Sequence, residues 1–203
     1  YKWKLKKILI VIIFTILTFS SNSLYSASSH QTAETVHKEV IEFIQTNEEL
    51  YEQNKEQFIK NIDSIMDPVV DFRRIARNVM GKYYKQSSSA QREEFFQVFR
   101  STLLTTYADT FVEFKDEKIK VLPPKTKPKK PNRSKVEVEI ITATKVYPAT
   151  YDMYLTKNGT WKIINIVVNG VNLGLTFRNQ FYSLSEKRNA NIDLVIQEWV
   201  AAL

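Results

Sequence analysis

The chain of 203 residues contains no cysteine, only two histidines and only four glycines. The lack of cysteine excludes a disulfide framework, thiol chemistry and a lipid anchor on cysteine, so the core must be stable without covalent cross-links. His30 lies beside an expected signal cleavage region, and we expect His37 on the polar face of an early helix. Neither position suits a histidine-based triad or metal cluster, so the sequence predicts no metal site and no cofactor. Four glycines are also too few for a phosphate-binding glycine loop.

The N-terminus has the pattern of an export signal. Four lysines between positions 2 and 7 precede an apolar stretch from Ile8 to Phe19, which gives way to serines and asparagine. This stretch is short for a membrane span, which needs about 20 apolar residues. We therefore expect a signal peptide over residues 1–27 and export to the periplasm of the remaining chain, 28–203, with an uncleaved N-terminal anchor as the alternative.

Positive charge is concentrated in the leader and in one internal segment. The formal charge of +7 includes the four lysines of the leader, so the chain that follows carries only +3. Eight basic residues between positions 118 and 135, with no acidic residue between Lys118 and Lys135, account for the excess, and the rest of that chain is net acidic. A single local basic loop argues against nucleic acid as a partner, since such proteins carry a distributed basic face.

The first half of the expected domain, residues 32–114, has a helical pattern. Apolar residues recur at spacings of three and four, and no glycine occurs before Gly81, which is placed to end a helix. We expect a helix to begin at Asp67 and Pro68. Ser88 and Gln91 have the spacing of a capping box, which predicts a long helix with an aromatic face after them.

The second half, residues 117–203, begins with strands and ends with helices. Alternating residues predict strands around Val136–Ile140 and Tyr151–Leu155, and Asn158-Gly159 predicts the hairpin that follows. In the strand from Trp161 to Val168 we expect Ile163 on one face and Ile164, Ile166 and Val168 on the other, so that both faces seek burial. The fold class is therefore α+β, a single domain with a curved antiparallel sheet wrapped by helices.

Apolar side chains on these elements outnumber what two packed layers require. We interpret them as the lining of a cavity between helices and sheet, although plain core is the favoured alternative for any single residue. The candidates on the helices and strands up to residue 168 are Phe72, Ile75, Val79, Phe99, Leu103, Tyr107, Tyr151, Met153, Ile166 and Val168.

A sheet wrapped by helices could also hold an acid-base enzyme of the ketosteroid-isomerase type. Asp152 with Tyr107 and Tyr151 would be its candidate groups. An aspartate that alternates with core residues on a strand is more simply explained as a surface residue, and no convergent acid-base set is evident. We therefore expect a protein that is not an enzyme.

Three segments together resemble one known family. They are DFRRIARNVMGKYYK (71–85), QREEFFQVFRSTLLTTYADTF (91–111) and WKIINIVVNGVNLGLTFRNQF (161–181). In combination they are similar to the MlaC family, also called the toluene-tolerance family. The resemblance implies a nuclear-transport-factor-like cone with an added helical lobe, and a phospholipid held tail-first in the periplasm.

The resemblance also implies site residues and partners. The family signature near its pocket falls on Val168, Val171, Leu173, Phe177, Arg178 and Phe181, of which Arg178 is a possible headgroup contact. The implied function is carriage of phospholipid between an outer-membrane lipoprotein complex and an inner-membrane ABC transporter complex.

The basic loop supports an alternative function. Lys127, Lys129 and Lys130 could contact a headgroup or a partner, or they could dock an exported interaction module on an acidic surface. A solvated loop without a specific role is as good an explanation of these three lysines.

Overall fold

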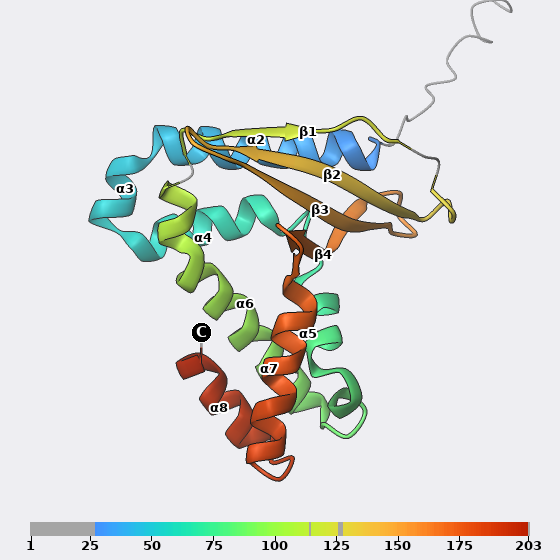
Figure 1. Cartoon of the computed structure of the whole chain (residues 1–203). Helices are drawn as coiled ribbons and strands as arrows, with labels where there is room; N and C mark the ends of the chain where they lie inside the picture. Colours follow the sequence, from blue (N-terminus) through green and yellow to red (C-terminus); the bar gives the residue numbers. More distant parts are fainter. Residues whose placement is uncertain (1–26, 114, 126–127, 203) are drawn as a thin grey trace, which may run out of the picture.

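The computed structural model describes residues 27–113, 115–125 and 128–202, with side chains described as far as Trp199. Apart from Ala27, the expected signal peptide lies outside the described residues. Helices come first, a meander of strands follows and two helices end the described chain (Figure 1). The elements are α2 (Ser29–Thr46), α3 (Glu48–Gln53), α4 (Lys55–Met66), α5 (Phe72–Met80), the 3₁₀ helix η1 (Gly81–Tyr84), α6 (Ser89–Glu113), β1 (Lys118–Val121), β2 (Arg133–Ile141), β3 (Val146–Leu155), β4 (Trp161–Val168), β5 (Val171–Asn172), α7 (Leu173–Lys187) and α8 (Ile192–Ala202).

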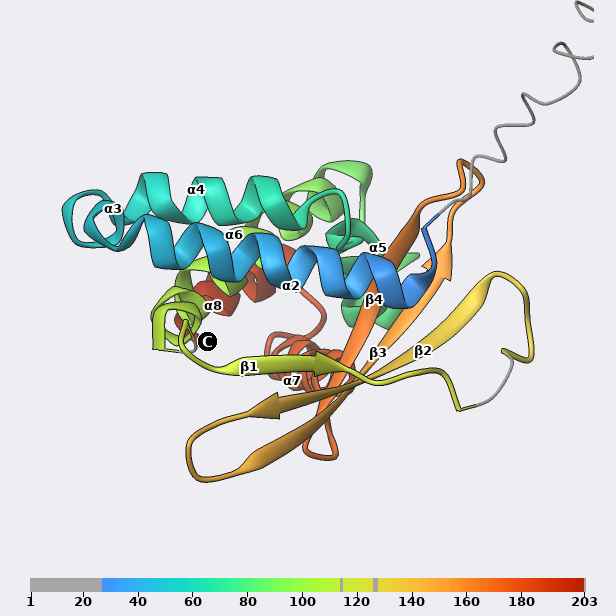
Figure 2. The same ribbon diagram turned by 90° about the horizontal axis from the view of Figure 1, so that it is seen from above.

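The described strands form one antiparallel sheet in the order β1-β2-β3-β4-β5. Helix α2 packs along one face, here called the helix face, where Val136 and Tyr151 are buried (Figure 2). Side chains alternate along a strand. Lys135 and Asp152, which pair with each other across β2 and β3, therefore lie on the opposite face, here called the open face. This arrangement confirms the expected α+β fold with an antiparallel sheet and wrapping helices.

A bulge in β4 changes the predicted faces of that strand. Met153 pairs with Ile163, whereas the preceding Asp152 pairs with Asn165, so Ile164 is an extra residue in β4. The extra residue places Ile163 and Ile166 on the same face, because a bulge shifts the alternation of side chains along the strand by one position. The expectation that Ile163 and Ile166 point to opposite faces was therefore wrong.

The helix predicted to begin at Asp67 begins four residues later. Asp67 ends α4, and the side chain of Asp71 instead accepts a hydrogen bond from the Arg74 amide as the N-cap of α5. Between the two helices, Val70 forms an isolated bridge with Ile163 of β4. The chain is thus held extended at Val70 by the sheet, which local sequence does not reveal.

Other local signals were confirmed. The Ser88 amide donates to the Gln91 side chain at 2.9 Å, and the Gln91 amide donates to Ser88 Oγ at 3.1 Å, so the capping box is complete. Gly81 ends α5 with a φ of +50°. Gly159, with a φ of +80°, lies in the predicted hairpin turn between β3 and β4.

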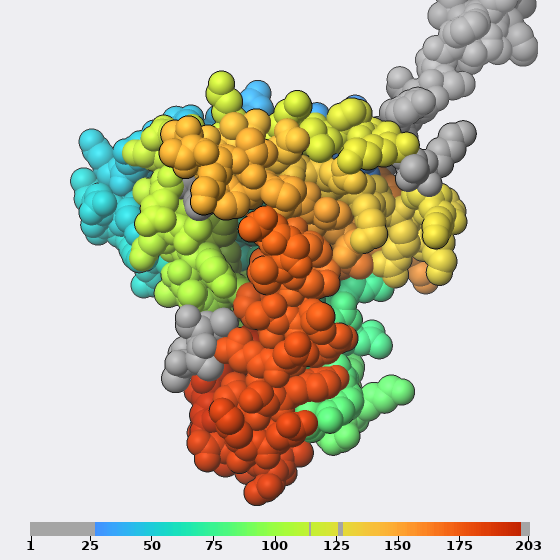
Figure 3. All heavy atoms as spheres, in the orientation of Figure 1, coloured from blue at the N-terminus to red at the C-terminus, as the bar shows by residue number. Residues whose placement is uncertain are grey.

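Helix α6 runs from the sheet layer into a lower bundle with α5, α7 and α8 (Figure 1). Phe95 and Phe99 on α6 contact the ring of Trp199 on α8, with centroid distances of 5.4 and 5.9 Å. Phe177 and Phe181 on α7 complete this aromatic cluster. Figure 3 shows α7 and α8 on the surface of the same lower half. The aromatic face of α6 is thus covered mainly by helices.

Candidate functional site

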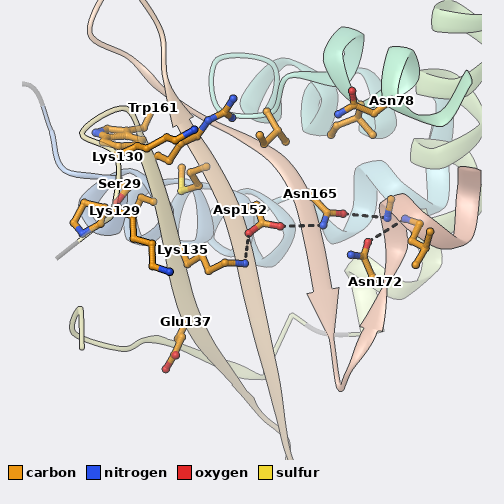
Figure 4. A pocket seen from close by; sticks show the side chains of 18 of the residues that line it. Ser29, Asn78, Lys129, Lys130, Lys135, Glu137, Asp152, Trp161, Asn165 and Asn172 are labelled. Atoms are coloured by element: carbon orange, nitrogen blue, oxygen red, sulfur yellow. Dashed lines mark hydrogen bonds and ion pairs between the residues drawn. The ribbon is translucent and has the colours of Figure 1, made fainter. Parts of the chain in front are cut away.

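A groove of about 1190 Å³ lies beside the open face of the sheet. Its walls come from β2, β3 and β4, from α5, from the first turn of α7 and from the segment between β1 and β2 (Figure 4). Pockets for small ligands usually measure about 300 to 1,000 Å³. The groove is therefore large enough for a ligand bigger than most metabolites.

Apolar side chains from three elements form the main apolar part of the groove lining. Ile75 comes from α5, Trp161 and Ile164 from β4, and Leu175 from the first turn of α7. Leu175 is 43% exposed. The bulge described above is what brings Ile164 to the groove. The further apolar lining residues are Tyr84, Pro123, Pro124, Pro128 and Met153.

A line of hydrogen bonds crosses the groove from β2 to α7 (Figure 4). Lys135 Nζ donates to one oxygen of Asp152 at 2.7 Å, and Asn165 Nδ2 donates to the other at 3.0 Å. The Gly174 amide then donates to Asn165 Oδ1 at 3.1 Å. A Cβ atom at position 174 would lie 2.5 Å from that same oxygen, so glycine permits the contact. These bonds fix the start of α7 against the sheet.

The acid-base alternative is not assembled here. Asp152 lies on the open face and is satisfied by Lys135 and Asn165. Tyr151 points to the opposite face, beneath α2, and Tyr107 is 38% exposed on α6. The three groups proposed for an enzyme therefore do not converge on one cavity.

Basic residues dominate the polar lining of the groove. Only Glu137 and Asp152 are acidic, and they form ion pairs with Lys125 and Lys135. The remaining basic lining residues are Arg77, Lys85, Lys129, Lys130, Arg133 and Arg178. The groove thus combines an apolar lining with an excess of positive charge, which suits an amphiphile that carries an anionic group.

The sequence suggested that His37 lies on the polar face of its helix, and this prediction is wrong. Its Nε2 lies 2.8 Å from the Tyr151 hydroxyl, beneath the sheet. Burial lowers the pKa of His37 to about 4 and raises that of the Tyr151 hydroxyl. Both groups are therefore neutral near pH 7, so this pair contributes a hydrogen bond and no charge. The spacing of polar residues along α2 does not predict this contact, because the contact depends on where the sheet packs against the helix.

The predicted site residues fall in three environments. Five line the groove, namely Ile75, Met153, Lys129, Lys130 and Arg178. Six others belong to the buried core, namely Phe72, Val79, Phe99, Tyr151, Phe177 and Phe181, and Met153, only 1% exposed, belongs to both groups. Four pack partly buried against that core, namely Leu103, Ile166, Val168 and Leu173.

Three predicted residues remain, and none of them is assigned to these three environments. Tyr107 and Val171 are 38% and 53% exposed and do not line the groove. Lys127 lies outside the described residues.

Sequence reasoning missed several groove residues. Trp161 and Ile164 had a signal, the apolar residues on both sides of their strand, but their position required the bulge. Arg133 belongs to the basic run seen in the sequence, whereas Leu175, Arg77 and Lys85 carried no distinguishing signal, since exposed residues of these types occur on any helix.

Neither a metal site nor a membrane span emerges from the described residues. In that part of the chain no three side chains of metal-binding type come together, and no helix is both long and apolar enough to cross a bilayer.

The fold and the groove define an α+β protein with one large amphiphilic groove among its described residues. A family model described as MlaC protein matches residues 34–201, so the chain belongs to the MlaC family. This confirms the resemblance drawn from the three sequence segments.

Relatives and a solved structure agree with that assignment. Toluene tolerance protein Ttg2D of Pseudomonas putida is 28% identical over 172 residues, covering 84% of this chain and 79% of the relative. The intermembrane phospholipid transport system binding protein MlaC of Haemophilus influenzae is 26% identical, with 79% of each chain covered. A phospholipid-binding protein from Ralstonia solanacearum, solved in complex with a phospholipid, shares the fold, with a TM-score of 0.78 at 21% identity and coverage of 87% of this chain and 96% of that one.

Proposed function

We propose that this chain is a non-enzymatic phospholipid carrier that operates in the periplasm. The observation that carries the proposal is the groove itself, because apolar side chains from α5, β4 and α7 adjoin a basic lining. An acyl chain needs the apolar side chains, and a phosphate group needs the basic lining. Membership of the MlaC family and the phospholipid-binding relatives support the same function.

The energetic need for such a carrier is large. Each methylene withdrawn from water is worth about 0.8 kcal/mol, so exposing two long acyl chains costs on the order of 20 kcal/mol. In the carrier the chains lie first against Ile75, Ile164 and Leu175. Phe99 and Phe177 lie deeper, in the aromatic cluster, and contact the chains only if α7 moves away from α6. Phe181, also on α7, lies in the same cluster and becomes accessible only by the same movement.

Membership of the MlaC family and the relative named as an intermembrane phospholipid transport protein support a route between two membranes. The carrier takes lipid at one membrane and releases it at the other, and its partners are an outer-membrane lipoprotein complex and an inner-membrane ABC transporter complex. We place the movement that releases the lipid at the start of α7, because Gly174 lines the groove and Gly170 lies just before β5.

A transfer assay tests the function with a matched pair of variants. Leu175 and Leu194 are both exposed helix leucines, at 43% and 41%, but only Leu175 lines the groove. We expect the purified chain to move labelled phospholipid from donor to acceptor vesicles, Leu175→Glu to slow this transfer several-fold, and Leu194→Glu to leave it unchanged.

Two results would count against the proposal. No transfer by the folded chain would contradict lipid carriage. Equal transfer by the two glutamate variants would instead move the lipid away from the groove.

A further inference from the structure

Six basic side chains of the groove have no acidic partner among the described residues. They are Arg77, Lys85, Lys129, Lys130, Arg133 and Arg178. Arg77 and Arg133 contact only the faces of Tyr84 and Tyr154, at 5.1 and 5.5 Å from the ring centroids. Such contacts leave the guanidinium charge uncompensated.

Away from the groove, arginine is commonly paired. Arg73 binds Glu93, Arg100 binds two aspartates and Arg188 binds Glu198. Some lysines outside the groove are also paired, as Lys55 is with Asp109 and Lys115 is with Glu48. Other basic side chains, such as Arg92 and Lys82, also bind a backbone carbonyl or an aromatic ring and not an acid, so what distinguishes the groove is that six such cations line one hollow of the described chain.

The arrangement of these cations matters as much as their number. Arg77 lies on α5, Arg178 on α7, Lys129 and Lys130 in the segment before β2, so positive charge comes from different sides of the same hollow. A cleft lined by one sign of charge focuses the field and concentrates counter-ions. The two acidic lining residues do not oppose this field, because Lys125 and Lys135 neutralise them.

We infer that the groove selects phospholipids whose headgroup carries a net negative charge, such as phosphatidylglycerol, over zwitterionic phosphatidylethanolamine. The inference rests on the proposed function. Both headgroups present a phosphate to the cations, but the ammonium of phosphatidylethanolamine is repelled by them, whereas the glycerol of phosphatidylglycerol is neutral. One arginine guanidinium can also donate hydrogen bonds to two oxygens of the same phosphate. This contact favours a headgroup that has no cation of its own to compete for those oxygens.

The expected size of the preference follows from surface electrostatics. A lysine or arginine close to an anionic lipid is worth about 1 kcal/mol, which corresponds to about fivefold in affinity. We expect phosphatidylglycerol to exceed phosphatidylethanolamine in the bound lipid by at least this factor at low salt. The preference should weaken as salt rises, because the screening length falls from about 30 Å at 0.01 M to about 8 Å at 0.15 M.

The experiment loads the chain from vesicles that contain the two lipids in equal amounts with identical acyl chains. Bound lipid is extracted and counted by mass spectrometry. The variant combines Lys129→Gln, Lys130→Gln and Arg178→Gln. The control combines Lys145→Gln and Lys187→Gln, two basic residues outside the groove. We expect the groove variant, which keeps three of the six cations, to bind a similar total of lipid with a clearly smaller excess of phosphatidylglycerol, and the control to keep the wild-type ratio.

The outcomes separate this inference from the proposed function. If the wild type binds the two lipids in the same ratio as in the vesicles, the inference is overturned but the proposed lipid carriage is not. An anionic preference of unchanged size in the groove variant also overturns it. If neither lipid is bound, the proposed function fails as well.

A calorimetric titration with glycerophosphoglycerol, which has the headgroup but no acyl chains, distinguishes a lipid site from a free phosphate site. We expect no measurable binding at millimolar concentration. Tight binding of this soluble ester would overturn the assignment to a lipid headgroup.

Discussion

His37 and Tyr151 meet beneath the sheet, with 2.8 Å between the imidazole Nε2 and the phenol oxygen and with their rings edge to face at 5.5 Å. The contact joins α2 to the middle of β3 on the face opposite the groove. It therefore helps hold the helix that covers the sheet.

The first prediction concerns pH and stability. Burial lowers the pKa of His37 from 6.5 to about 4, so the folded chain keeps it neutral where the unfolded chain takes up a proton. The free energy of unfolding should consequently fall as pH drops below about 6.5, by about 2 kcal/mol between pH 7 and pH 5. Urea unfolding at several pH values measures this fall.

The matched variants are His37→Phe and His30→Gln. We expect the first to lose most of the fall between pH 7 and pH 5, since it has no group to protonate beneath the sheet, and the second to retain it. A parallel decline in the wild type and in His37→Phe would show that other groups cause it.

The second prediction concerns the glycine at the start of α7. Gly174→Ala places a methyl group 2.5 Å from Asn165 Oδ1, so it should disturb that contact and cost about 1 to 3 kcal/mol of unfolding free energy. In an Asn165→Ala background the same change should cost much less, because the obstructing oxygen is gone. Thermal unfolding of the four proteins completes the cycle, and strictly additive effects would contradict the close contact.

The third prediction contrasts two ion pairs. The Arg100 guanidinium lies 2.7 Å from Asp63 and 2.8 Å from Asp67, and its side chain is only 21% exposed. Arg100→Ala should therefore cost about 1 to 3 kcal/mol. Lys60→Ala removes a pair with Glu56 whose side chains are 63% and 80% exposed, and should change stability by less than about 0.5 kcal/mol. Similar costs for both variants in denaturant unfolding would refute the distinction.

The fourth prediction concerns movement beside the groove. Strand β5 has two residues, the turn before it places Gly170 at a φ of +81° in open space, and Val171 is 53% exposed. We expect residues 169–174 to show exchange on the microsecond to millisecond timescale by NMR relaxation dispersion. Relaxation as uniform as that of α6, with and without lipid vesicles, would remove the basis for release at this point.

Much of the fold could be predicted because its signals are local. The capping box at Ser88 and Gln91, the helix end at Gly81 and the turn at Gly159 each depend on a few neighbouring residues. The errors arose where distant segments decide. Asp67 was mistaken for a helix start because the extension of Val70 depends on pairing with β4.

The candidate site was harder to predict, for a physical reason. A phenylalanine in a core and one in a lipid pocket have the same spacing and the same chemistry, so Phe99 and Phe177 could not be told apart from groove residues by pattern. The groove-lining Ile164 depends on a single-residue bulge, which shifts the alternation without a glycine or proline to mark it. The basic residues of the segment before β2, in contrast, were visible as a run of like charge.

The central claim is that the chain carries a phospholipid, and native mass spectrometry of protein purified from cells without detergent tests it most directly. We predict a bound mass equal to that of a diacyl phospholipid, reduced in Leu175→Glu and retained in Leu194→Glu. Protein that is free of lipid in repeated preparations, although folded, would contradict the claim.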